Sequence, residues 1–318
     1  MHRKPFYRHL LALVLTAGFA LAALPAGSQP AGADVEPYLQ VETGSHAAVV
    51  RRIDVAVDRS LVVTVSDDKT ARVWDLATGE LRQVLRPAVG AGEIGRLYGV
   101  AIHPTEDLVA VGGTTGRGVG SHRILMYSMS SGLPVRSFDA RGGNIKKLAW
   151  SRDGSLLLAV YAGDHALRAF DRTGALVHEQ PLTAPSYGLA VSADGMAAAS
   201  SLDGRIVLVT ARDGRVAPVR TFTVPTSQAV GLAFSPDGSR LAVASFSPRD
   251  AGGRRKAKTA PQVLDVASGR TLLQLPEHEV SDGSLMSVAW STDGRQIVVG
   301  GSGYNARRRF PIFFHDAA

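Results

Sequence analysis

One pattern of apolar and polar residues occurs six times along the chain. Each copy places an alanine between two larger apolar residues and then passes through a turn into a second apolar run. The copies are DVAVDRSLVVTVS, GVAIHPTEDLVAVGG, KLAWSRDGSLLLAVY, GLAVSADGMAAASS, GLAFSPDGSRLAVAS and SVAWSTDGRQIVVGG. The central alanines, 41 to 56 residues apart, are Ala56, Ala101, Ala149, Ala190, Ala233 and Ala289. A recurrence of this length is typical of repeat architectures.

The alternation around each alanine predicts a β-strand with two apolar faces. Residues two apart point to the same side of a strand, so the large neighbours share one face and the alanine occupies the other. Such a strand is expected to be buried on both sides, between stacked sheets. Asp-Gly pairs at 153/154, 194/195, 237/238 and 293/294 suit tight hairpin turns, because both residues tolerate a positive φ.

A second hairpin follows the first in five of the six units. Its turns contain Gly79, Gly132, Gly174, Gly214 and Gly269. Four strands in roughly 45 residues match the blade of a propeller. We therefore expect an all-β fold, a single β-propeller of six four-stranded blades. The last unit supplies only three strands, and EPYLQVETGSH near the start resembles the fourth strands. Residues 37–43 are accordingly predicted to close the ring by pairing with about 310–316.

The segment SDDKTARVWDLATG of the first unit resembles a WD40 repeat. The resemblance extends over residues 36–316, with TolB-like and YVTN-type propellers as near alternatives. It places His46, Asp68 and Trp74 at the positions of a structural network, with Ser66 or Thr64 as its hydroxyl. Later units are degenerate, because the position of Trp74 holds Tyr127, Phe170, Val209 and Leu264 in units 2 to 5.

The N-terminus has the features of a secretory signal peptide. Arg3, Lys4 and Arg8 precede an apolar run from Leu10 to Leu24, and small residues follow. This order predicts a signal peptide at 1–33 and a propeller at 34–318; an uncleaved anchor is the alternative, although the run is short for a membrane span. We expect an exported protein, periplasmic or secreted. Arg outnumbers Lys by 29 to 6, which favours a bacterial source.

Composition narrows the possible chemistry. The chain has no cysteine, so it has neither disulfides nor a thiolate nucleophile or ligand. The histidines lack zinc-site spacing, and no cofactor or metal is expected. His46, Ser66 and Asp68 could form a hydrolase triad, but a buried structural network explains them better, because a triad is defined by geometry rather than by residue types. The formal charge is +7 for the chain and +4 for a mature chain from Asp34, a modest surplus that does not by itself indicate nucleic acid.

Three long turns between second and third strands are expected on one face of the ring, at 114–122, 247–261 and 302–309. Insertions on one face often mark a binding surface. Tyr98, Lys146 and Tyr187, each three residues before a central alanine, are expected at the same face near the channel mouth. The predicted partner-binding residues are Arg117, Arg249, Arg254, Arg255, Lys256, Lys258, Arg307, Arg308, Arg309, Tyr98, Lys146 and Tyr187.

These features predict a non-catalytic exported scaffold that binds an acidic protein or peptide through its loop-bearing face. Arginine suits such a partner because its planar fork binds carboxylates bidentately. Three alternatives stay open. The loops could be merely solvated, with Glu277, Glu279 and Asp282 partly neutralising them. The channel could hold a hydrolase- or lactonase-type active site. The arginine loops could bind a polyanion.

Overall fold

The computed structural model describes residues 42–116, 122–224, 228–246, 258–279, 284–301 and 311–317, with backbone alone at 258, 259 and 279. Within these ranges the fold is all-β, and its one helical element is the 3-10 turn η1 (Val57–Arg59). All strands but one short pair form six antiparallel sheets in chain order, so each repeat of the sequence is one blade. The prediction of a six-bladed β-propeller is confirmed.

The first three blades each contain four strands in simple up-and-down order. Blade 1 consists of β1 (Val50–Ala56), β2 (Leu61–Ser66), β3 (Ala71–Asp75) and β4 (Leu81–Leu85). Blade 2 consists of β5 (Leu97–Ile102), β6 (Val109–Gly113), β7 (Arg123–Tyr127) and β8 (Pro134–Asp139). Blade 3 consists of β9 (Ile145–Trp150), β10 (Leu156–Tyr161), β11 (Ala166–Asp171) and β12 (Leu176–Pro181).

The remaining blades follow the same plan with one addition and one difference. Blade 4 consists of β13 (Ser186–Val191), β14 (Met196–Ser201), β15 (Arg205–Arg212) and β16 (Arg215–Thr223). Blade 5 consists of β17 (Gln228–Phe234), β18 (Arg240–Phe246), β20 (Gln262–Asp265) and β21 (Thr271–Gln274). A separate two-stranded sheet pairs β19 (Lys258–Thr259) with β22 (His278–Glu279). Blade 6 has three strands among the described residues, β23 (Ser287–Trp290), β24 (Gln296–Gly300) and β25 (Ile312–Asp316).

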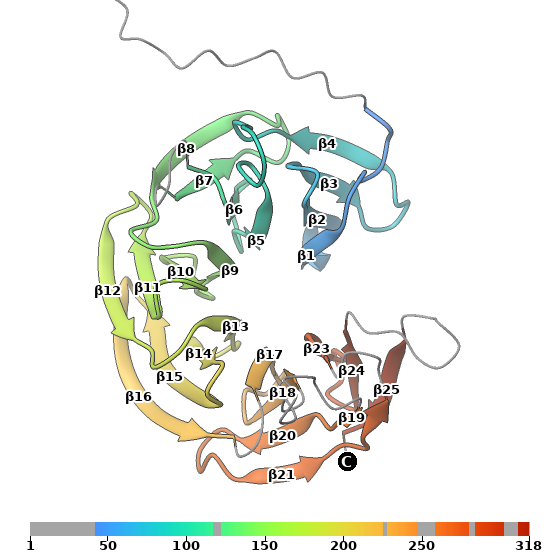
Figure 1. The fold of residues 1–318 in the computed structure, drawn as a ribbon, viewed down its shortest axis with the longest axis vertical. Helices are drawn as coiled ribbons and strands as arrows, with labels where there is room; N and C mark the ends of the chain where they lie inside the picture. The colour runs from blue at the N-terminus through green and yellow to red at the C-terminus, as the bar shows by residue number, and fades with distance from the viewer. Residues whose placement is uncertain are drawn as a thin grey trace, which may run out of the picture. The chain divides into compact units, whose positions relative to one another are not determined.

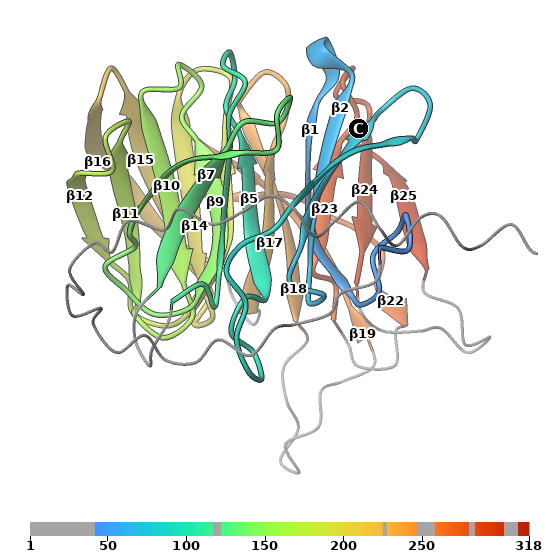
Figure 2. The same ribbon diagram turned by 90° about the horizontal axis from the view of Figure 1, so that it is seen from above.

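The strands that contain the central alanines are the innermost strand of each blade. Figure 1 shows β1, β5, β9, β13, β17 and β23 nearest the centre of the ring, and Figure 2 shows the blades from the side. Each of these strands packs against the innermost strand of the next blade, from β1 through to β23. Five hydrophobic clusters result, each between two consecutive blades. The core is therefore a series of inter-blade layers.

The expectation that every inner strand is buried on both sides is wrong for the two end blades. On β1, Val55 is 43% exposed, and on β23 Ala289 is exposed while Val288 and Trp290 are only partly buried. The cause is that no comparable packing joins β23 to β1 in the part of the chain described. Residues 37–41 of the predicted closing strand lie outside the described residues, and Glu42 and Thr43 belong to no strand.

The hairpin turns follow the glycine pattern of the sequence. All the glycines of the predicted turns have positive φ, including Gly154 at +70° and Gly214 at +69°. In the first hairpin of blade 3 the turn is further held by Ser151, whose hydroxyl donates to Asp153 Oδ1 at 2.6 Å. A Cβ on Gly154 would lie 2.6 Å from the His103 ring, whereas one on Gly214 would meet nothing within 4 Å.

Substituting these two glycines separates backbone strain from steric contact. Gly214→Ala should lower the free energy of unfolding by about 1 kcal/mol, because an L-residue with positive φ is strained. Gly154→Ala should cost about 2 kcal/mol or more, because the new methyl group also displaces the buried His103. Urea denaturation of both variants measures the difference. Equal losses would show that blade 2 and blade 3 are not in tight contact at this turn.

Candidate partner-binding site

Three equivalent positions of successive blades meet at one mouth of the channel. Tyr98 on β5, Lys146 on β9 and Tyr187 on β13 each lie three residues before the central alanine of their strand. Lys146 Nζ lies 4.3 Å from the centre of the Tyr98 ring and 5.8 Å from that of Tyr187. The ammonium group is therefore held between two aromatic rings, in the geometry of a cation–π contact.

These residues line an open cavity of about 940 Å³. Its polar lining includes Arg51, Arg52, Glu93, Arg96 and Asn144. Two of the cations are already neutralised locally, because Arg51 pairs with Asp67 and Arg96 pairs with Glu93. Lys146 and Arg52 form no ion pair with the described residues. The cavity thus has two cationic side chains that a negatively charged group could neutralise.

The mouth also contains polar groups whose bonding is incomplete. The Oδ1 atom of Asn144 is buried and has no hydrogen-bond partner in the described part of the protein. Burial lowers the pKa of Lys146, and the nearby Arg51 charge lowers it further, against the opposing effect of Glu93. A donor for the Asn144 oxygen and a carboxylate for the Lys146 ammonium group would each lower the free energy of the complex.

Most of the predicted basic loop residues lie outside the described residues. They are Arg117, Arg249, Arg254, Arg255, Lys256, Arg307, Arg308 and Arg309. For Lys258 the structure gives the backbone, which pairs with Glu279 as part of β19 and β22. The long fifth-unit turn is therefore not entirely a loop, because its last residues form this short strand. Tyr98, Lys146 and Tyr187 are the predicted partner-binding residues that the structure brings together.

His46, Thr64, Asp68 and Trp74 form one hydrogen-bond network inside blade 1. His46 Nδ1 lies 2.7 Å from Asp68 Oδ2, and His46 Nε2 lies 2.7 Å from Thr64 Oγ1. Trp74 Nε1 donates to the same Thr64 oxygen at 2.7 Å. With the ring proton of His46 on Nδ1, His46 donates to Asp68 and accepts from Thr64, and Thr64 accepts from Trp74, so every donor in the network has an acceptor. Of the two hydroxyls that the sequence left open, Thr64 is the one in the network.

Ser66 has a different role from the one a hydrolase triad would require. It is fully buried, its hydroxyl donates to the Ala48 carbonyl at 3.3 Å, and it accepts the Asp68 backbone N–H at 3.0 Å. Both ring nitrogens of His46 are directed at Asp68 and Thr64. Because a serine nucleophile needs exposure and a base within reach, this arrangement fits a structural clasp that holds the chain before β1 against the β2–β3 turn.

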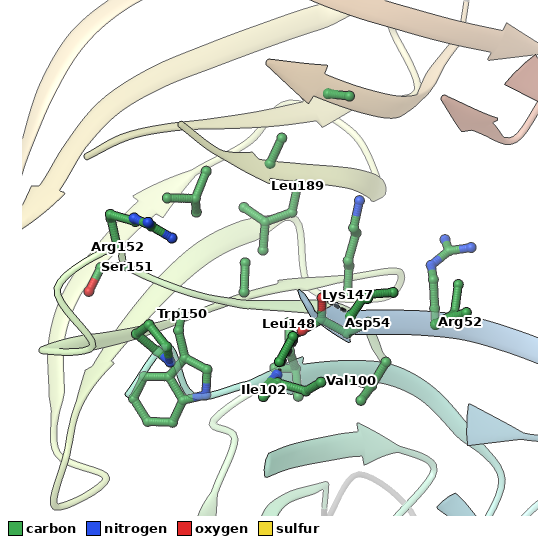
Figure 3. A pocket seen from close by; sticks show the side chains of 18 of the residues that line it. Arg52, Asp54, Val100, Ile102, Lys147, Leu148, Trp150, Ser151, Arg152 and Leu189 are labelled. Atoms are coloured by element: carbon green, nitrogen blue, oxygen red, sulfur yellow. Dashed lines mark hydrogen bonds between the residues drawn. The ribbon is translucent and has the colours of Figure 1, made fainter. Parts of the chain in front are cut away.

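Sequence reasoning missed a group of charged residues inside the channel. Arg52 and Asp54 on β1 and Lys147 on β9 line a second cavity of about 940 Å³ (Figure 3). A signal was present in the repeat itself. Two residues before the central alanine the other units have glycine or serine, at Gly99, Gly188, Gly231 and Ser287, whereas blades 1 and 3 have Asp54 and Lys147. Four residues before its alanine, blade 1 has Arg52, whereas the residue at the equivalent position of every other blade is buried.

Comparison with family models agrees with this structure. The model for the WD domain, G-beta repeat, matches residues 38–75, 216–249 and 269–305. These three matches and the six-bladed architecture agree with a WD40-repeat propeller. Propellers of this family are commonly protein-interaction scaffolds and are typically non-catalytic. A comparison with curated proteins found no match.

No cluster of three or more His, Asp or Glu side chains that could hold a metal ion occurs among the described residues. Within the same residues, no helix has the length and apolar character needed to cross a bilayer.

The clasp in blade 1 makes a stability prediction. Although burial opposes its charge, hydrogen bonds from His46 and Thr70 hold the pKa of the Asp68 carboxyl well below its usual range. The Asp68 carboxylate therefore stabilises the fold fully above its pKa in the unfolded chain, about 4. This stabilisation is lost as the pH falls through the lower pKa of Asp68 in the folded protein. Asp68→Asn should lower the free energy of unfolding by about 2 kcal/mol at pH 7, with a smaller difference from wild type at pH 3.

Urea denaturation at the two pH values measures this effect. The matched control is Asp67→Asn, which removes the neighbouring carboxylate from its pair with the exposed Arg51. A surface pair of this kind contributes less than about 1 kcal/mol. An equal loss for both variants would contradict the clasp.

Proposed function

We propose that the protein is an exported, non-catalytic interaction scaffold whose channel mouth binds an acidic segment of a partner protein. The observation that carries the proposal is Lys146, held between Tyr98 and Tyr187 with no carboxylate partner among the described residues. The two rings offer flat apolar area, and the ammonium group between them is ready to pair with an incoming carboxylate. Aromatic and cationic side chains in a partly desolvated cavity are typical of interface hot spots.

A peptide segment fits the remaining lining of the mouth. The free acceptor of Asn144 is matched by a backbone N–H, which every non-proline residue of a peptide carries. Acidic side chains on the segment would neutralise Lys146 and Arg52. The repeat pattern predicts the basic residues of the three long turns on the same face. There they would strengthen the preference of the mouth for an acidic segment.

The mouth residues are tested by affinity capture with quantitative mass spectrometry. The propeller serves as bait for proteins of the cell envelope. The double variant Tyr98→Ala/Lys146→Gln should retain its partner about tenfold or more less tightly, because it loses an aromatic anchor and a charge. Neutralising Arg254, Arg255, Lys256, Arg307, Arg308 and Arg309 to Gln should reduce binding and flatten its salt dependence.

Arg215→Gln is the matched control, because Arg215 is an exposed cation on β16, an outer strand away from the mouth. It should bind the partner as wild type does. Thermal unfolding of all variants should be nearly unchanged, since Tyr98 and Lys146 line an open cavity and the six basic residues fall in turns predicted from the sequence. Undiminished capture by the double variant would place the binding site elsewhere on the propeller.

Export is tested separately from binding. The order of basic, apolar and small residues in 1–33 predicts removal of this segment. Mass spectrometry of protein from the envelope fraction should find an N-terminus near Ala23, Gly27 or Asp34. Recovery of a full-length chain from the cytoplasm would contradict export while leaving the binding site untouched.

A further inference from the structure

Two cationic side chains project into the interior of the channel from different blades. Figure 3 shows Arg52 of β1 and Lys147 of β9 directed into the same opening. Both residues line the cavity of about 940 Å³ and also a smaller adjoining one of about 490 Å³. The opening is therefore large enough for a small organic molecule.

Neither cation is neutralised by the described residues. Arg52 donates from Nη1 to the Arg51 carbonyl at 3.2 Å, while its buried Nε has no partner. The carboxylate nearest in the lining, Asp54, accepts backbone N–H groups instead, from Ile102 at 2.7 Å and from Val55 at 3.0 Å. A buried donor without an acceptor costs free energy, and an oxyanion placed in the opening would supply that acceptor.

Part of the lining around the two cations is accessible hydrocarbon. Ile53 and Val55 of β1 are 60% and 43% exposed, and Val191 of β13 and Phe234 of β17 are partly exposed. An inorganic ion would leave this surface in contact with water. An anion with an apolar body would cover it and gain the corresponding hydrophobic free energy.

We propose that the channel interior is a binding site for an organic monocarboxylate, with the carboxylate between Arg52 and Lys147 and the hydrocarbon part along the apolar wall. The charge count favours a singly charged group. Arg52, Lys147 and Asp54 together leave one net positive charge, which a carboxylate neutralises and a doubly charged phosphate exceeds; the other charged lining residues, Asp58, Arg59 and Arg152, lie outside this group. The guanidinium fork and the ammonium group together match the two oxygens of a carboxylate.

The electrostatics of the empty channel agree with this assignment. Burial lowers the pKa of Lys147 to about 7, the Arg52 charge acting in the same direction and Asp54 opposing it. Burial also raises the pKa of Asp54, against its backbone hydrogen bonds. These two residues of β1 are the charges that act on Lys147. Asp58, Arg59 and Arg152 also line the cavity, and its lining from β5, β13 and β17 is apolar. A bound carboxylate would therefore favour the protonated lysine.

Calorimetric titration of the purified protein with octanoate at pH 7 tests the site. Octanoate should bind at least about tenfold more tightly than the neutral octan-1-ol, and octyl phosphate should bind more weakly than octanoate. Arg52→Gln and Lys147→Gln should each weaken octanoate binding about tenfold or more. The control is Arg82→Gln, which removes an exposed cation of β4 that pairs with Asp75 and should leave octanoate affinity unchanged.

The pH dependence adds a second readout. As pH rises from 7 to 9, octanoate stays ionised while Lys147 loses its proton, so wild-type affinity should fall. In Lys147→Gln this fall should disappear. Thermal unfolding of both channel variants should be unchanged or occur at a higher temperature, because each removes an unneutralised cation.

Three results would overturn the proposal. These are equal affinity for octanoate and octanol, unchanged octanoate affinity in both channel variants, or a large loss of stability in both without a loss of affinity. The last would make the two cations structural. The two sites share Arg52, but Tyr98→Ala/Lys146→Gln should still bind octanoate, so failure of the mouth site can be distinguished from failure of this one.

Discussion

The packing of each blade's innermost strand against the next blade is the interaction on which the rest of the structure depends. The strands approach closely because one face has alanine or glycine. A Cβ on Gly99 would lie 3.1 Å from Leu148 Cγ of the next blade, and one on Gly231 would lie 2.8 Å from the Met286 carbonyl oxygen. This close approach fixes the rotation of each inner strand. It thereby determines which positions face the mouth and which face the interior of the channel.

Much of this arrangement could be predicted from the sequence, because it follows from local periodicity. The turn glycines, the strand alternation and the equivalence of Trp74 with Tyr127 and Phe170 are all properties of one repeat. The meeting of Tyr98, Lys146 and Tyr187 followed from their shared position three residues before the alanine. The exposure of Val55 could not be predicted, because it depends on whether the first and last blades touch, which no single repeat encodes.

The two cations inside the channel show a second limit of prediction from the sequence. Arg52 and Lys147 are ordinary basic residues when each strand is considered alone, and they become a pair only when the ring brings β1 and β9 around one opening. The useful signal was comparative. Lys147 occupies a position that other blades reserve for glycine or serine, and Arg52 occupies one where they have buried residues. A departure from the repeat at an inward position, more than any motif, indicates where a repeat protein has been adapted to a ligand.

Among the described residues nothing covers the faces of blades 1 and 6 that lie at the two ends of the row, and this changes the cooperativity expected of the fold. In a closed ring every blade is supported on two sides, so local opening at any one place costs a similar free energy. Here the described blades form a row with two ends, which resembles a linear repeat array in which stability is a sum of neighbour contacts. Blades 3 and 4, each buried between two neighbours, would then exchange their amide protons most slowly, and opening would begin at the ends. The channel, whose walls include β1, would widen first from that side.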